Sequence, residues 1–119
     1  MAKILVVDDS RNIRTDVSEY FISQGIDVIT AVDGEDGFEK IKKNPGLKLV
    51  MCDVNMPNMD GMTMVEKVRS VGNQICFIML TTEDDRALKE RGKAMGVKGW
   101  IVKPFNGPSV IHLIKRIIE

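Results

Sequence analysis

Reactive side chains of three kinds, Asp, Thr and Lys, stand where four short apolar runs of this chain end. Asp8 and Asp9 follow the first run, Asp53 the third, Thr81 the fourth and Lys103 the fifth. Each run is typical of a buried strand, and the carboxyl ends of parallel strands meet at one edge of a sheet. Carboxylates brought together there repel one another unless a proton or a cation lies between them. Oxygen ligands of this kind suit Mg²⁺, with Mn²⁺ as a substitute, so we expect a divalent cation.

The remaining groups suit a phosphoryl anion. Thr81 offers a hydroxyl donor, and Lys103 offers a compact positive charge. Asp53 is then a candidate nucleophile, because a carboxylate that attacks phosphorus forms a covalent but labile acyl phosphate. The residue types therefore predict Mg²⁺-dependent phosphoryl transfer to a carboxylate.

Simpler explanations exist for each group taken alone. Asp8 and Asp9, with Ser10, could cap a following helix, and Lys103 could be a solvated loop residue before Pro104. Their joint placement at the ends of separate strands favours one shared site over several unrelated loops.

The elements that must position these groups follow from an alternation of apolar runs with amphipathic stretches, repeated five times. This alternation predicts an α/β, doubly wound fold: a five-stranded parallel sheet with helices on both faces. The expected strands are residues 3–7, 27–31, 47–52, 75–80 and 99–102. The expected helices run up to residue 25, over 34–43, up to residue 72, over 83–95, and from residue 107 to the end.

The last two helices differ in the quality of their apolar faces. Residues 83–95 offer a poor inner face, with charged residues around Ala87, Leu88, Ala94 and Met95. In the last helix we expect Asn106 to cap the first turn and Pro108 to lie within it. The predicted inner stripe is made of Val110, Leu113, Ile114, Ile117 and Ile118.

Composition bounds the possible functions. A length of 119 residues with 44% hydrophobic residues suits a single domain, 1–119. Seventeen basic residues balance seventeen acidic ones, which argues against binding to nucleic acid or to an anionic membrane. The longest apolar run, 75–80, is too short for a membrane span, so we expect a cytoplasmic protein. Cys52 and Cys76 are expected to be reduced packing residues.

Five pieces of the chain together resemble the receiver domain of two-component response regulators, over essentially the whole length. They are residues 4–10, Asp53, residues 56–61, residues 79–82 and residues 102–105. The nearest form is the stand-alone, CheY-like chemotaxis type with no output domain. The resemblance implies a (βα)5, flavodoxin-like fold with strand order 2-1-3-4-5, and a cis peptide bond before Pro104.

The resemblance also assigns roles to the residues. Asp53 accepts a phosphoryl group from a histidine kinase, Lys103 pairs with that group, and Thr81 hydrogen-bonds it. Asp8, Asp9 and Asp53, with the backbone carbonyl of Asn55, hold Mg²⁺.

Switching couples Thr81 to an aromatic residue of the fifth strand, which here is Trp100, where the family usually has Tyr or Phe. Thr82 is a second departure, because the family usually has a small residue there. Asn55, Thr82 and Glu83 are the positions expected to tune the lifetime of the acyl phosphate. The expected partner surface consists of Trp100, Val102, Lys115 and Arg116.

The function implied is a monomeric phosphoacceptor switch that catalyses its own phosphorylation and dephosphorylation and is otherwise not an enzyme. Its implied partners are a chemotaxis histidine kinase, an effector such as the flagellar motor switch protein, and a phosphatase. A phosphorelay shuttle or phosphate sink is the main alternative. A small Mg²⁺-dependent hydrolase with an aspartyl-phosphate intermediate and an unphosphorylated scaffold are less favoured, since adjacent Asp8 and Asp9 do not match a D-x-D motif and every site group is present.

Overall fold

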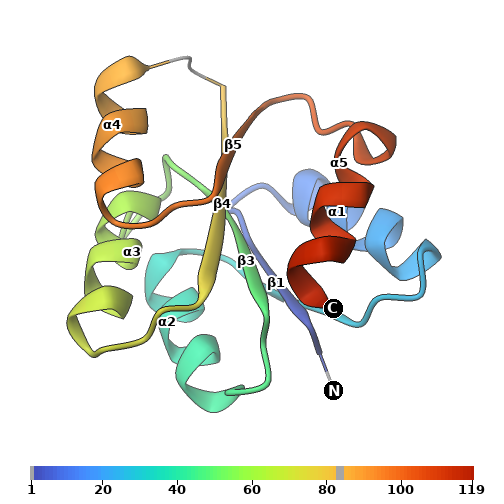
Figure 1. The fold of residues 1–119 in the computed structure, drawn as a ribbon, viewed down its shortest axis with the longest axis horizontal. Coiled ribbons are helices and arrows are strands. Elements are labelled where there is room, and N and C mark those ends of the chain that lie inside the picture. Colours follow the sequence, from blue (N-terminus) through green and yellow to red (C-terminus); the bar gives the residue numbers. More distant parts are fainter. Residues whose placement is uncertain (1, 83–84) are drawn as a thin grey trace.

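A computed structural model of the chain describes residues 2–82 and 85–119. Its centre is a five-stranded parallel sheet with the order β2-β1-β3-β4-β5, which confirms the expected fold (Figure 1). The strands are β1 (Ile4–Val7), β2 (Val28–Ala31), β3 (Leu49–Asp53), β4 (Cys76–Thr81) and β5 (Gly99–Val102). The predicted strands match these bounds to within two residues.

The register of the sheet brings the reactive strand ends to one edge. Val7 of β1 lies beside Cys52 of β3, and Thr81 of β4 lies beside Val102 of β5. The residues that follow these strands therefore emerge together at the carboxyl edge, where open parallel sheets bind their ligands.

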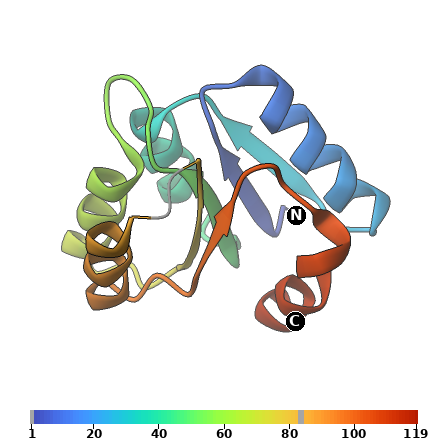
Figure 2. The ribbon, with the colours of Figure 1, turned by 90° about the horizontal axis from the view of Figure 1, so that it is seen from above.

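Helices cover both faces of the sheet. They are α1 (Arg11–Ser23), α2 (Gly34–Lys43), α3 (Gly61–Ser70), α4 (Arg86–Ala94) and α5 (Gly107–Ile118). Helices α1 and α5 lie on one face, and α2, α3 and α4 lie on the other (Figures 1 and 2). The core accordingly forms two clusters, because alternate strand residues point to opposite faces. Leu5 and Val50 belong to the α2–α4 side, whereas Ile4 and Leu49 belong to the α1–α5 side.

Side-chain caps begin four of the five helices that the structure describes. Ser10 accepts a hydrogen bond from the Ile13 amide at 3.4 Å, and aspartates precede α2, α3 and α4 in the same role. Asn106 is the N-cap residue of α5 as expected, although its side chain makes no capping hydrogen bond. Pro108 lies in the first turn of α5 as expected, where the missing N–H has no helical partner to lose.

The structure corrects the inner faces of α4 and α5. On α5 the buried residues are Gly107, Ile111, Ile114 and Ile118, while Leu113 is 48% exposed. Leu113 lies one position away from Ile114, and a helix turns about 100° per residue, so the two side chains point in different directions and only Ile114 faces the sheet.

On α4 the expected apolar residues Ala87 and Ala94 are exposed. The buried residue of this helix is Gly92, because the ring of Trp100 occupies the space beside it.

The remaining expectations concern cysteines and membranes. Both cysteines are free thiols, and burial raises the pKa of Cys52 well above its usual value, which keeps it unreactive. Among the described residues, none of the helices combines the length and the apolar character needed to cross a bilayer.

Candidate phosphoryl-acceptor and metal site

Three carboxylates meet at the carboxyl edge of the sheet. Asp53 is the last residue of β3, and Asp8 and Asp9 directly follow β1. Each offers an oxygen within 4.8 Å of the others. Asp8 is fully buried and Asp53 is 6% exposed, whereas Asp9 is exposed. The cluster therefore opens to solvent on the side of Asp9.

Lys103 supplies the positive charge that faces this cluster. Its Nζ lies 3.1 Å from Oδ2 of Asp8 and 3.3 Å from Oδ1 of Asp53. The lysine follows β5 directly, and its amide donates to the Thr81 carbonyl at 2.8 Å. The Lys103–Pro104 peptide bond is cis, as the resemblance implies.

The electrostatics of Asp53 and Lys103 are coupled. Burial and the neighbouring Asp8 charge raise the pKa of Asp53, against the opposing influence of Lys103 and of the Asn55 backbone amide. Burial alone would lower the pKa of Lys103, but its contacts with Asp8 and Asp53 outweigh this and raise it. The lysine therefore stays charged, while the aspartate cluster carries more negative charge than one lysine neutralises.

This arrangement can be compared with known proteins. The family model of the response regulator receiver domain matches residues 4–115. The chain belongs to this family.

Relatives of this receiver domain include chemotaxis proteins. The chemotaxis protein CheY of Treponema pallidum is 34% identical over 119 residues, which cover 98% of this chain and 83% of that protein. The solved structure of CheY4 from Vibrio cholerae superposes with a TM-score of 0.89 at 40% identity, over 98% of both chains. CheY of Borrelia burgdorferi, solved in a complex with CheX, BeF3 and Mg²⁺, gives a TM-score of 0.91 at 29% identity over 99% of this chain and 90% of that one.

Receiver domains bind Mg²⁺ through an acidic cluster, and the residues present here fit such an ion. Oδ2 of Asp8 is buried and, among the described residues, accepts no well-aligned hydrogen bond, although Lys103 Nζ stands 3.1 Å away. Buried carboxylate oxygens without such a donor are costly. A hard cation with oxygen ligands from Asp8, Asp9 and Asp53 would satisfy this atom.

Two of the three positions expected to tune the lifetime of the acyl phosphate, Asn55 and Thr82, lie near the acidic cluster. Asn55, in the loop between β3 and α3, is exposed, and its backbone amide donates a hydrogen bond to the Asp53 carboxylate. Thr81 is 2% exposed at the end of β4, and exposed Thr82 lines a pocket of about 430 Å³ together with Lys103 and Pro104. Glu83, the remaining lifetime position, lies outside the described residues.

Trp100 of the receiver domain packs under α4 rather than standing free on the surface. The residue is half-buried and belongs to the α2–α4 core side. A Cβ placed on Gly92 would lie 2.6 Å from Cζ2 of Trp100, well inside van der Waals contact. The indole thus occupies a notch that a glycine leaves open. The other expected surface residues, Val102, Lys115 and Arg116, are exposed on β5 and α5.

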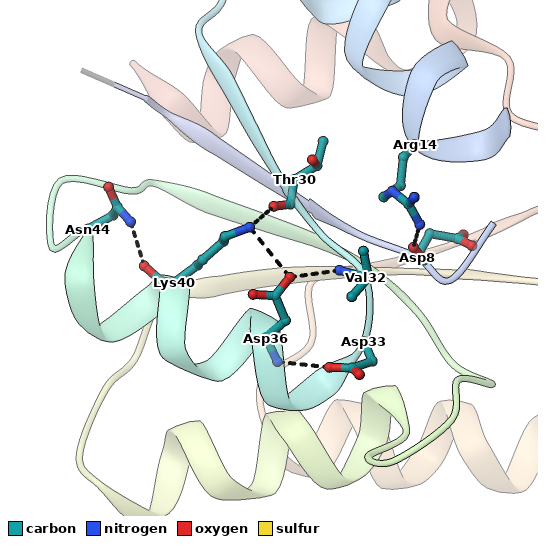
Figure 3. Close-up of polar contacts among 8 residues, drawn as sticks. All are labelled: Asp8, Arg14, Thr30, Val32, Asp33, Asp36, Lys40 and Asn44. Carbon is teal, nitrogen blue, oxygen red and sulfur yellow. Dashed lines mark hydrogen bonds and ion pairs between the residues drawn. The ribbon is translucent and has the colours of Figure 1, made fainter. Parts of the chain in front are cut away.

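Sequence reasoning missed two residues that bear on this site. Arg14 of α1 donates from a guanidinium nitrogen to the Asp8 carbonyl at 2.7 Å, which places a second cation beside the cluster (Figure 3). Its spacing from Asp8, six residues away across the start of a helix, is the only sequence signal. Gly92 was missed because a glycine inside a polar helix carries no apolar signal of its own.

Proposed function

We propose that this receiver domain accepts a phosphoryl group on Asp53 from the phosphohistidine of a histidine kinase. The observation that carries this proposal is a nearly buried carboxylate with a cationic Nζ at 3.3 Å and a metal-suited cluster beside it. A carboxylate oxygen of Asp53 attacks phosphorus, and the P–N bond breaks. The electron pair of that bond stays with the imidazole nitrogen of the kinase.

The surrounding residues have separate roles in this transfer. Asp8, Asp9, Asp53 and the Asn55 carbonyl would hold Mg²⁺, which supplies charge neutralisation for the transferred oxygens. Lys103 exchanges its contact with Asp53 for a phosphoryl oxygen while it keeps its ion pair with Asp8. The Thr81 hydroxyl donates to another phosphoryl oxygen.

The acyl phosphate biases the domain between two conformations. Thr81 and Trp100 couple the presence of the phosphoryl group to the conformation of β5. The effector binds the surface made by Trp100, Val102, Lys115 and Arg116. Asn55, Thr82 and Glu83 set the rate at which water reaches the phosphoryl group. The domain thereby promotes its own phosphorylation and dephosphorylation.

The cellular role that we favour is chemotaxis signalling in the cytoplasm by a monomeric single domain. Its partners would be a chemotaxis kinase, a flagellar motor switch protein and a phosphatase. The similarity to chemotaxis proteins at 34% and 40% identity supports this role. Transfer of the phosphoryl group onward to a histidine phosphotransfer protein would instead assign a phosphorelay shuttle.

The test combines phosphate uptake with the fluorescence of the single tryptophan. Wild type, Asp53→Asn and the control Asp16→Asn, an exposed carboxylate of α1, are titrated with Mg²⁺ and then beryllofluoride. We expect a saturable fluorescence change in wild type and control only. In parallel, a phosphorylated kinase should label those two proteins and not Asp53→Asn. Equal labelling of Asp53→Asn would reject Asp53 as the acceptor.

A further inference from the structure

The outer edge of the sheet at β2 exposes backbone groups that a further strand could use. Strand β2 pairs with β1 on one side only. The amides of Ile4 and Asp8 donate to the carbonyls of Asp27 and Ala31, so these residues direct their backbone groups toward β1. Because successive residues of a strand alternate in direction, Thr30 and Val32 direct theirs to the open edge.

Two side chains of α2 bind these outward groups. Lys40 Nζ donates to the Thr30 carbonyl at 2.6 Å, and the Val32 amide donates to Oδ2 of Asp36 at 3.0 Å (Figure 3). The two side chains also pair with each other, with 3.4 Å between Nζ and Oδ2. Asp36 is held in the first turn of α2 by its amide, which donates to Asp33 at 2.8 Å. Asp36, Lys40 and the backbone of β2 thus form one connected network.

This network reproduces the hydrogen bonds of a missing strand. In a parallel pair of strands, a residue donates its N–H to the carbonyl of the residue that precedes its opposite neighbour. Its own carbonyl accepts from the amide of the residue that follows that neighbour. For a residue opposite Ala31, those two groups are the Thr30 carbonyl and the Val32 amide. Lys40 supplies the donor and Asp36 the acceptor, so the pair occupies the place of one residue of a sixth strand.

The surroundings of this edge would favour pairing of an unprotected β2 with a strand of another molecule. Ile22 of α1 is 57% exposed and Val32 is 49% exposed. Both lie beside the edge, and Ile22 lines an open groove of about 640 Å³ with Val28, Ile29, Asp36 and Lys40. An edge with open hydrogen-bonding groups and exposed apolar side chains can pair with another strand. A second copy of the chain carries the same edge, and a two-fold axis would place β2 against β2.

We propose that the Asp36–Lys40 pair keeps this receiver domain from associating with a second copy through β2. A β2 strand from another molecule would need the Thr30 carbonyl and the Val32 amide in either strand direction. It would therefore have to displace two hydrogen bonds to charged groups before it could form its own. This inference is independent of phosphorylation and of the role of Asp53.

The test compares two double variants that leave the net charge unchanged. Asp36→Ala/Lys40→Ala removes the network, while Glu39→Ala/Lys42→Ala removes an ion pair of the same helix that is 3.0 Å long, with both side chains 52% exposed. Sedimentation equilibrium gives the dissociation constant of the dimer for each protein. We expect the first variant to lower this constant at least about tenfold relative to wild type and control.

A third variant shows whether the association uses β2. Adding Thr30→Pro to Asp36→Ala/Lys40→Ala removes an outward amide without touching the β1–β2 ladder, which proline tolerates at an edge. This addition should restore the monomer. Far-UV circular dichroism checks that each variant is folded, and Lys40→Met alone replaces the double variant if that protein does not fold. Association no stronger than in the Glu39/Lys42 control, or association that survives Thr30→Pro, would overturn the proposal.

Discussion

Asp53 must be ionised to attack phosphorus, yet its surroundings favour the neutral carboxyl. Burial and the Asp8 charge raise its pKa, and the help from Lys103 and the Asn55 amide does not fully compensate. Metal-free folded protein therefore holds a carboxylate at the cost of some stability. A bound cation would remove that cost, so one residue links folding stability to metal binding.

We expect Asp53→Asn to stabilise the metal-free protein at pH 7, by about 3 °C in melting temperature. The folded pKa of Asp53 lies above its unfolded value, so the native state holds the proton more tightly. The ionised group then costs stability above the folded pKa and nothing below the unfolded pKa. The increase in melting temperature of Asp53→Asn over wild type should therefore become smaller as the pH falls toward about 4.

Thermal melts in a chelator, repeated with Mg²⁺, measure this effect. Added Mg²⁺ should stabilise wild type more than Asp53→Asn, so the difference between their melting temperatures should become smaller. Asp16→Asn serves as the control for loss of one negative charge at an exposed position. A melting temperature of Asp53→Asn below that of wild type in the chelator at pH 7 would contradict this account.

Among the elements, α4 has a poorly buried inner face. Its nine residues bury only Gly92, and the ring of Trp100 on β5 fills the space that a side chain would take. Movement of α4 relative to β5 and movement of the indole are therefore sterically coupled. An effector whose binding depends on the conformation of Trp100 would therefore also depend on the position of α4.

Gly92→Ala tests this contact. Alanine in a helix interior normally gains up to about 1 kcal/mol over glycine. Here the added methyl meets the indole, so we expect a net loss of about 1–3 kcal/mol in the free energy of unfolding, or a displaced ring. Chemical denaturation and the emission maximum of Trp100 distinguish these outcomes, since a displaced indole emits at longer wavelength.

The matched control is Lys93→Ala on the exposed side of the same helix. In a Trp100→Val background the alanine at position 92 should recover its usual gain, because the methyl no longer meets a ring. If Gly92→Ala stabilises the wild-type protein without changing its emission, the notch does not constrain Trp100.

At the scale of the whole molecule, one sheet separates two core clusters. Trp100 packs with the α2–α4 cluster, while Ile114 of α5 lies fully buried in the cluster on the opposite face. Buried strands such as β1, β3 and β4 contribute alternate residues to both clusters. The two faces should therefore unfold together.

We expect Ile114→Ala to lower the free energy of unfolding by about 2–5 kcal/mol because it leaves a cavity. The Trp100 transition on the other face should shift by the same amount and coincide with loss of far-UV circular dichroism. Leu113→Ala, next along the helix but 48% exposed, should cost about 0.5 kcal/mol or less. A Trp100 transition that stays in place would mean that the faces unfold separately.

The sequence by itself determined the alternation of strands and helices and the chemistry at the strand ends. Apolar runs and helical periodicity are local signals, and each strand end could be found by counting along the chain. The strand order came with the family resemblance, because no local pattern encodes which strands are neighbours. Asp8, Asp9 and Asp53 likewise follow from the strand ends, and in the structure each has an oxygen within 4.8 Å of the others.

Only the tertiary structure decided the contacts that cross between elements. Leu113 and Ile114 are equally apolar, and packing against the sheet selects one of them. Gly92 is buried because a ring from another element reaches it, and Lys40 binds β2 because α2 runs alongside that edge. Such contacts depend on the distance and direction between elements, which side-chain type and spacing along one chain do not specify.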